Sequence, residues 1–123
     1  MNYTSIEQSK KLAEILPLES ADQTWARIAI AGANLGVPEE MQYRHNGDMP
    51  FQYYSGIGIP CWSLAALLSV LPRVDIEKEI CSDDTYDYRV KAYIGDGYIG
   101  DWFDNPVDAC VAMIKRLHES NLL

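Results

Sequence analysis

Apolar residues recur with helical spacing in three segments of the chain, residues 5–16, 63–71 and 105–118. Each segment opens on a residue type that caps helix N-termini: Ser5, Ser63 and Asn105. The pattern therefore predicts three amphipathic helices. Their apolar stripes comprise Ile6, Leu12, Ala13 and Leu16, then Leu64, Leu67, Leu68 and Leu71, and finally Val107, Cys110, Val111, Ile114 and Leu117.

Between the second and third helical segments the pattern changes to the strict alternation that is typical of strands. Residues 76–81, 86–94 and 98–103 are predicted strands, and Asp96-Gly97 is a hairpin signal between the last two. One face of the middle strand is expected to pack on the core and the other to meet solvent. The residues expected to face the core are Tyr86, Tyr88, Val90, Ala92 and Ile94, and those expected to face solvent are Asp87, Arg89 and Lys91. The prediction is a single α+β domain, residues 1–123, with an antiparallel β-meander and helices packed on the sheet.

The pattern between residues 20 and 60 is harder to interpret. A capping box at Ser20 and Gln23 favours a helix over the following residues, whereas residues 27–31 also fit a short strand, and both interpretations stay open. Glycines and prolines then break the chain into short pieces. Two aromatic runs predict strands around an Asn-Gly turn. These runs are residues 41–45 and 51–54.

Composition narrows the class of protein. The 123 residues are 48% apolar and 23% charged, which suits one globular domain and excludes the signature of disorder. A net charge of −8 repels phosphate backbones, so we expect no direct binding of DNA or RNA. No apolar run approaches about 18 residues, and the N-terminus lacks an apolar signal region, so we expect no membrane insertion or secretion. Three widely spaced cysteines favour a reducing cytoplasm over a disulfide framework.

Candidate chemistry in the sequence is sparse. Cys61 directly precedes a predicted helix start, where the helix dipole lowers a thiol pKa, and His45 or His118 could serve as its base. The competing interpretation is that Cys61 is a buried small apolar residue, which free cysteines usually are, and this interpretation is favoured.

Two groups of aspartates and one glycine-containing segment also match no metal-binding or phosphate-binding motif. The aspartates at 83, 84 and 87, and at 96, 101 and 104, match no EF-hand spacing, and turn chemistry explains them better. Residues 28–36 look like a strand entering a phosphate loop but contain neither G-x-G-x-x-G nor a following Lys-Ser/Thr pair. We therefore expect no metal and no cofactor.

Two stretches carry a resemblance to a known family. They are IPCWSLAALL at residues 59–68 and DNPVDACV at residues 104–111. They resemble a family of small uncharacterised proteins encoded in prophages and mobile elements of gut Bacteroides and relatives, and are loosely similar to phage α-β-α sandwich domains. The resemblance implies a fold and a mobile-element origin, and it carries over no site.

Exposed aromatic residues are the remaining functional signal, because aromatic side chains dominate protein interfaces. The candidate interaction surface is Tyr43, Phe51, Tyr53 and Tyr54. The rings at 93, 98, 102 and 103 could join it or complete the core, the latter particularly for Trp102. The sequence favours a non-enzymatic protein that binds a protein partner or itself, and the resemblance implies that this protein is of phage or mobile-element origin. The alternatives are an acidic inhibitor that mimics nucleic acid and a cysteine-dependent enzyme.

Overall fold

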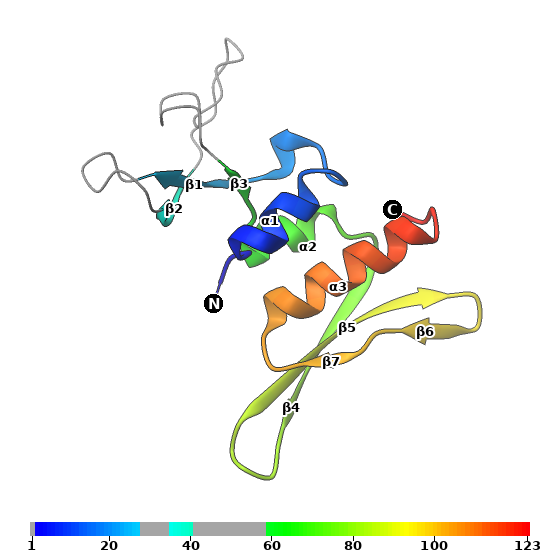
Figure 1. Cartoon of the computed structure of the whole chain (residues 1–123). Helices are drawn as coiled ribbons and strands as arrows, with labels where there is room; N and C mark the ends of the chain where they lie inside the picture. Colours follow the sequence, from blue (N-terminus) through cyan, green and yellow to red (C-terminus); the bar gives the residue numbers. More distant parts are fainter. Residues whose placement is uncertain (1, 28–34, 41–58) are drawn as a thin grey trace.

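The computed structural model describes residues 2–27, 35–40 and 59–123 (Figure 1). Within them the chain forms helices and strands in the order α1, a short 3-10 helix, β1, β2, β3, α2, β4, β5, β6, β7 and α3. The helices are α1 (Ile6–Leu12), the 3-10 helix (Leu18–Ser20), α2 (Leu64–Val70) and α3 (Pro106–Glu119). The strands are β1 (Gln23–Arg27), β2 (Leu35–Glu40), β3 (Ile59–Cys61), β4 (Val74–Ile80), β5 (Tyr86–Ile94), β6 (Gly97–Ile99) and β7 (Trp102–Phe103). The α+β class predicted from the sequence is confirmed.

Each helix begins where its capping residue predicts. Ser5 accepts a hydrogen bond from the Gln8 backbone and Gln8 returns one, which completes a capping box. Ser63 accepts from the Ala66 backbone. Asn105 accepts from the two backbone N–H groups of residues 107 and 108, with Pro106 at the first helical position. The first helix is shorter than predicted, because it ends at Leu12 rather than near residue 16.

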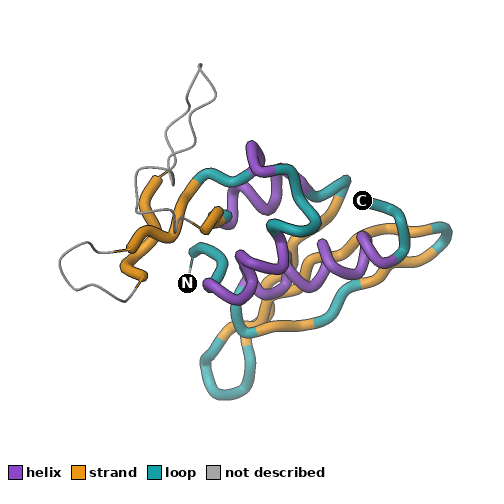
Figure 2. Tube along the Cα trace, turned by 45° about the horizontal axis from the view of Figure 1, so that its top comes forward, coloured by secondary structure: helices purple, strands orange, loops and turns teal. Residues whose placement is uncertain are grey.

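The described strands form two antiparallel sheets (Figure 2). The smaller has the order β2-β1-β3, and the larger is the predicted meander β4-β5-β6, with β7 also pairing β5. Residues 23–27 form a strand, β1, so the helix that the capping box at Ser20 and Gln23 favoured is wrong for these residues. Of the alternative strand at residues 27–31, only Arg27 lies within the described residues. The predicted strand at 98–103 is divided into β6 and β7, which pair with β5 in one continuous register.

The turns of the larger sheet follow from local chemistry. The loop between β5 and β6 consists of Gly95 and Asp96, one residue earlier than the predicted Asp96-Gly97 pair. Gly95 takes a φ of +60°, which a glycine adopts without strain at the first central position of a hairpin loop. In the loop between β4 and β5, Asp83 accepts hydrogen bonds from the Thr85 backbone and hydroxyl. The predicted turn role of Asp83-Asp84 is therefore confirmed.

The core lies between the three α-helices and one face of the larger sheet, with α3 packed across β5 (Figure 1). The whole predicted stripe of α3 is buried, and the helix adds two further buried side chains, Ala109 and Met113. Of the predicted core face of β5, Val90 and Ala92 are buried. Tyr86 and Ile94 are 43% and 41% exposed, which corrects their predicted burial. A helix about 10 Å wide cannot cover the full length of a nine-residue strand.

Candidate interaction surface

The outer face of the larger sheet, away from the helices, carries most of the exposed rings of the described residues. Because Val90 and Ala92 point into the core, their neighbours Arg89, Lys91 and Tyr93 point outward. The strand register then places Tyr98 opposite Tyr93 and Trp102 opposite Arg89. These five residues, Arg89, Lys91, Tyr93, Tyr98 and Trp102, are called the aromatic–cation cluster below.

The cations of the cluster lie between its rings. The Arg89 guanidinium carbon is 4.5 Å from the centroid of the Trp102 ring and 5.2 Å from that of Tyr98. The Lys91 ammonium is 4.2 Å from the Tyr98 centroid and 5.6 Å from that of Tyr93. The two tyrosine rings meet edge to face at 6.2 Å. Each such cation–ring contact contributes about 0.5–1 kcal/mol at an exposed site, so the five side chains hold one another in place.

Acidic residues of β4 anchor the cluster from the side. Glu77 pairs with Arg89 at 2.9 Å and with Lys91 at 2.6 Å. The hydrogen bond from Lys91, followed by that from Arg89, lowers the pKa of Glu77. The Tyr93 hydroxyl donates to Asp75 at 2.7 Å, and this bond raises the pKa of Tyr93. The carboxylates thus keep both cations charged and fix one ring.

The rings remain available to a partner in spite of these contacts. Tyr93 is 55% exposed, Tyr98 49% and Trp102 37%. The expectation that Trp102 in particular completes the core is therefore wrong. Trp102 and Phe103 are consecutive in β7, so their side chains point to opposite faces, and it is Phe103 that packs against the core. This alternation was visible in the sequence, but which of the two rings faces inward depends on the register with β5.

The predicted surface at Tyr43, Phe51, Tyr53 and Tyr54 lies outside the described residues. That prediction stays untested. The two predicted strands at residues 41–45 and 51–54 lie outside the described residues as well.

Cys61 occupies a buried polar cluster rather than an open site. Its side chain is fully buried, and its sulfur lies 3.5 Å from the hydroxyl and from the backbone carbonyl oxygen of Thr4. The Thr4 hydroxyl also hydrogen-bonds Ser9 at 2.7 Å. Burial is the largest influence on the Cys61 thiol and raises its pKa. A nucleophilic thiol needs a lowered pKa and access to substrate, so these observations favour the packing role.

A nucleophilic Cys61 would react with a thiol reagent faster than Cys81 and Cys110. The burial of Cys61 predicts the opposite order. We expect Cys81, which is partly exposed, to be labelled first by a thiol reagent at neutral pH in the native protein. Cys61 and Cys110 are buried, and burial raises the pKa of Cys110 to about 12. A local opening that costs only about 1.4 kcal/mol slows labelling tenfold. Mass spectrometry of time points would give the order, and labelling of Cys61 ahead of Cys81 would reopen the enzyme hypothesis.

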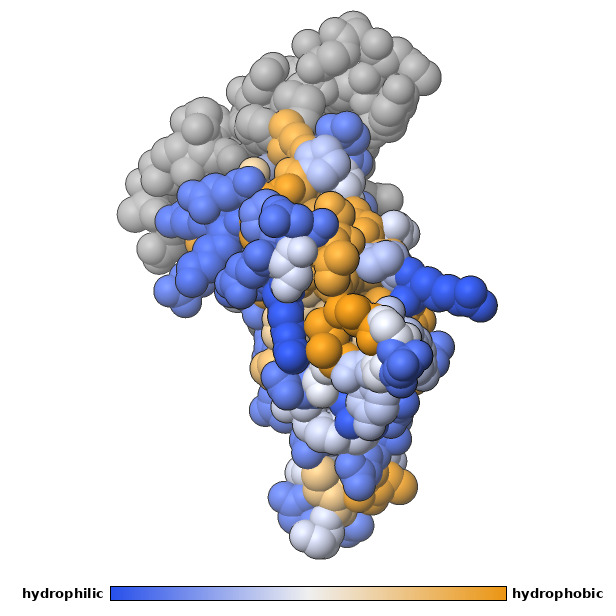
Figure 3. Space-filling model, turned by 90° about the vertical axis from the view of Figure 1, so that its right-hand side faces the viewer, coloured by the Kyte–Doolittle hydropathy of each residue, from blue (hydrophilic) through white to orange (hydrophobic). Residues whose placement is uncertain are grey.

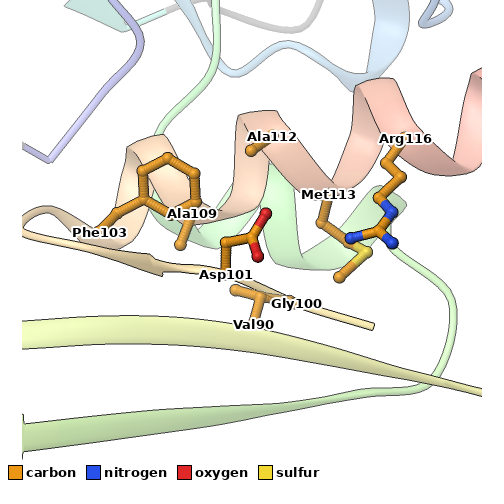
Figure 4. Close-up of a pocket in the computed structure, with 8 residues that line it drawn as sticks. All are labelled: Val90, Gly100, Asp101, Phe103, Ala109, Ala112, Met113 and Arg116. Atoms are coloured by element: carbon orange, nitrogen blue, oxygen red, sulfur yellow. The ribbon is translucent and has the colours of Figure 1, made fainter. Parts of the chain in front are cut away.

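A small cavity lies between α3 and the segment that links β6 to β7 (Figure 4). Its volume of about 20 Å³ suffices for one water molecule and for no substrate. Figure 4 shows Ala109, Ala112 and Met113 of α3 facing Val90 and Gly100 across it. Among the residues that the structure describes, no group of three or more histidine, cysteine, aspartate or glutamate side chains is placed to hold a metal ion.

Comparison of the chain with protein-family models, with curated proteins and with solved structures found no match. No helix within the described part of the chain combines the length and apolar character needed to cross a membrane.

Proposed function

We propose that this protein is a non-enzymatic binding module that recognises another protein through the outer face of its larger sheet. The observation that carries the proposal is the aromatic–cation cluster: three exposed rings with Arg89 and Lys91 held between them. Trp, Tyr and Arg are the residue types most enriched among the few interface residues that supply most of the binding energy.

The order within the cluster supports binding. A flexible arginine or lysine loses side-chain entropy when a partner immobilises it, at a cost of about 0.5–1.5 kcal/mol. Here Glu77 and the rings already hold both cations before any partner arrives. The surface is thus preorganised for binding, because part of this side-chain entropy is already lost when the protein folds.

Charge favours a protein partner over nucleic acid. The outer face of β4 and β5 carries Asp75, Glu77, Glu79 and Asp87 beside its two cations, and the whole chain has a net charge of −8. Exposed rings can stack on bases, but nucleic-acid binding also needs unpaired cations for the phosphates. Both cations of the cluster are paired with Glu77.

The two alternatives from the sequence gain no comparable support. An inhibitor that mimics nucleic acid needs its carboxylates gathered on one face, whereas α1, β4, the 81–85 turn and α3 all carry some. The cysteine-dependent enzyme was predicted on Cys61, whose side chain is fully buried. The phage or mobile-element origin and the cytoplasmic location stay predictions.

The experiment compares affinity capture by three versions of the tagged protein from lysates of the cells that carry its gene. The test variant is Trp102→Ala/Tyr98→Ala. The control is Leu122→Ala, which removes an exposed apolar side chain that follows α3 and belongs to no strand. Loss of hot-spot rings weakens binding by about 2 kcal/mol or more, roughly 30-fold. We expect proteins retained by the wild type and the control to be absent with the test variant. The same retained set in all three would refute the proposal.

A further inference from the structure

The edge strand β4 presents an unused backbone edge. All seven of its residues pair with β5 on one side. No strand of the described residues pairs with its other side. Alternate N–H and C=O groups of an edge strand point outward, and such an edge is a template for a further strand. Figure 1 shows β4 and the adjoining half of β5 extending beyond the helices, at the end of the molecule away from β1–β3.

The two faces of β4 differ sharply along this edge. Asp75, Glu77 and Glu79 lie on the outer face, next to the aromatic–cation cluster. Ile76 and Ile80 lie on the other face and are 47% and 66% exposed, because the helices do not reach them. In Figure 3 the lower end of the molecule, where this hairpin lies, shows apolar residues at its surface. A strand added here would meet carboxylates on one face, and on the other two isoleucines with Lys78 between them, whose ammonium lies over the Tyr86 ring.

The charge on the outer face is incompletely balanced within the protein. Glu77 has two cationic partners, but Glu79 stands directly opposite Asp87 in the register. Like charges directly opposite one another destabilise a strand pair. Among the described residues no lysine or arginine forms an ion pair with either carboxylate. A cation supplied beside Glu79 would reduce this repulsion.

A second copy of the chain does not fit the edge. Two antiparallel edge strands related by a two-fold axis form one continuous sheet, in which the outer faces of both copies lie on the same side. In that arrangement the carboxylates of one β4 would lie opposite those of the other. Lys78 adds a further obstacle on the inner face, where charged side chains protect edges against self-pairing.

We propose that the free edge of β4 binds an extended segment of a basic partner protein as an additional strand, in which lysine or arginine alternates with apolar residues. This inference rests on the proposed binding function and names the partner's chemistry. Main-chain hydrogen bonds to the edge supply affinity, the carboxylates select the basic side chains, and Ile76 and Ile80 select the apolar ones.

The probe is a synthetic peptide of alternating lysine and valine, as long as the seven residues of β4. Binding is followed by fluorescence anisotropy, and protection of the β4 amides by hydrogen exchange. Two control peptides share its composition: one groups the lysines at one end, and one is N-methylated at alternate backbone nitrogens. We expect the first peptide alone to bind and to protect β4. Equal binding by the N-methylated peptide, or no binding by any peptide, would overturn the proposed edge pairing.

A pair of charge reversals locates the site. Glu79→Lys should weaken binding of the alternating peptide about tenfold, since a cross-strand attraction becomes a repulsion. Glu119→Lys makes the same charge change at the end of α3 and should leave the affinity unchanged. Equal weakening by both variants would mean that only net charge matters and would overturn the proposal. A dimer in light scattering whose β4 amides are protected without peptide would assign the edge to a second copy instead.

The double variant Trp102→Ala/Tyr98→Ala and the variant Glu79→Lys together separate this inference from the proposed function. Proteins captured from the lysate that are lost with Trp102→Ala/Tyr98→Ala but kept with Glu79→Lys would leave the outer face as a binding surface and remove the edge from it. Proteins kept by both variants would remove both proposals.

Discussion

Replacing Trp62 with alanine is expected to lower the free energy of unfolding by about 3–5 kcal/mol, the usual cost of deleting a large buried ring. Trp62 is fully buried in the core. It also ties three parts of the chain together. Its backbone N–H donates to the Thr4 hydroxyl at 3.1 Å, its carbonyl accepts from the Thr4 N–H at 2.9 Å, and its indole donates to Ser20 at 2.9 Å. The cavity would therefore open where the N-terminal segment meets α2.

Two further variants make this result interpretable. Trp62→Phe keeps much of the ring volume and loses the indole N–H, so it should cost less than the alanine variant while leaving Ser20 without its donor. Trp102→Ala deletes the same ring from the outer face, where it is 37% exposed, and should cost about 1 kcal/mol or less. Urea unfolding monitored by circular dichroism would measure all three. Similar costs at positions 62 and 102 would contradict the core assignment.

The two tryptophans illustrate what the sequence can predict in this protein. Trp62 stands just before the capping residue of a helix with a leucine stripe, a position from which an apolar side chain commonly packs on the first turns of the helix. The starts of all three helices can also be predicted from local sequence, because Ser5, Ser63 and Asn105 satisfy the first N–H groups of their own helices. The strand of the meander with the clearest alternation, β5, has the predicted bounds of residues 86–94.

The aromatic–cation cluster depends on information that a local pattern does not contain. Its rings come from β5, β6 and β7, and they meet because the register sets Tyr98 opposite Tyr93 and Trp102 opposite Arg89. A shift by one residue would turn Trp102 inward and Phe103 outward. The exposure of Ile76 and Ile80 is non-local as well, since alternation predicts a covered face but not how far the helices extend over it.

Replacing Gly100 with alanine is expected to cost about 1–3 kcal/mol from the backbone conformation alone. Gly100 has a φ of +152°, which side-chain-bearing residues rarely adopt, and it lies where the pairing of β6 and β7 with β5 is interrupted. A Cβ atom added there would overlap the Val90 carbonyl oxygen of β5 and approach the Arg89 side chain to 3.3 Å. Backbone cannot move aside as a flexible side chain can, so β5 itself would have to shift.

Gly97→Ala is the matched control for this change. Gly97 lies in β6, three residues before Gly100, has no positive φ, and a Cβ atom there meets nothing within 4 Å. It should change stability by less than about 0.5 kcal/mol in thermal unfolding. The shift of β5 in Gly100→Ala would also displace Arg89 from between Trp102 and Tyr98, so the tryptophan fluorescence of this variant should change in the folded state. Equal stability of the two alanine variants would contradict the backbone conformation of Gly100 and its close approach to Val90.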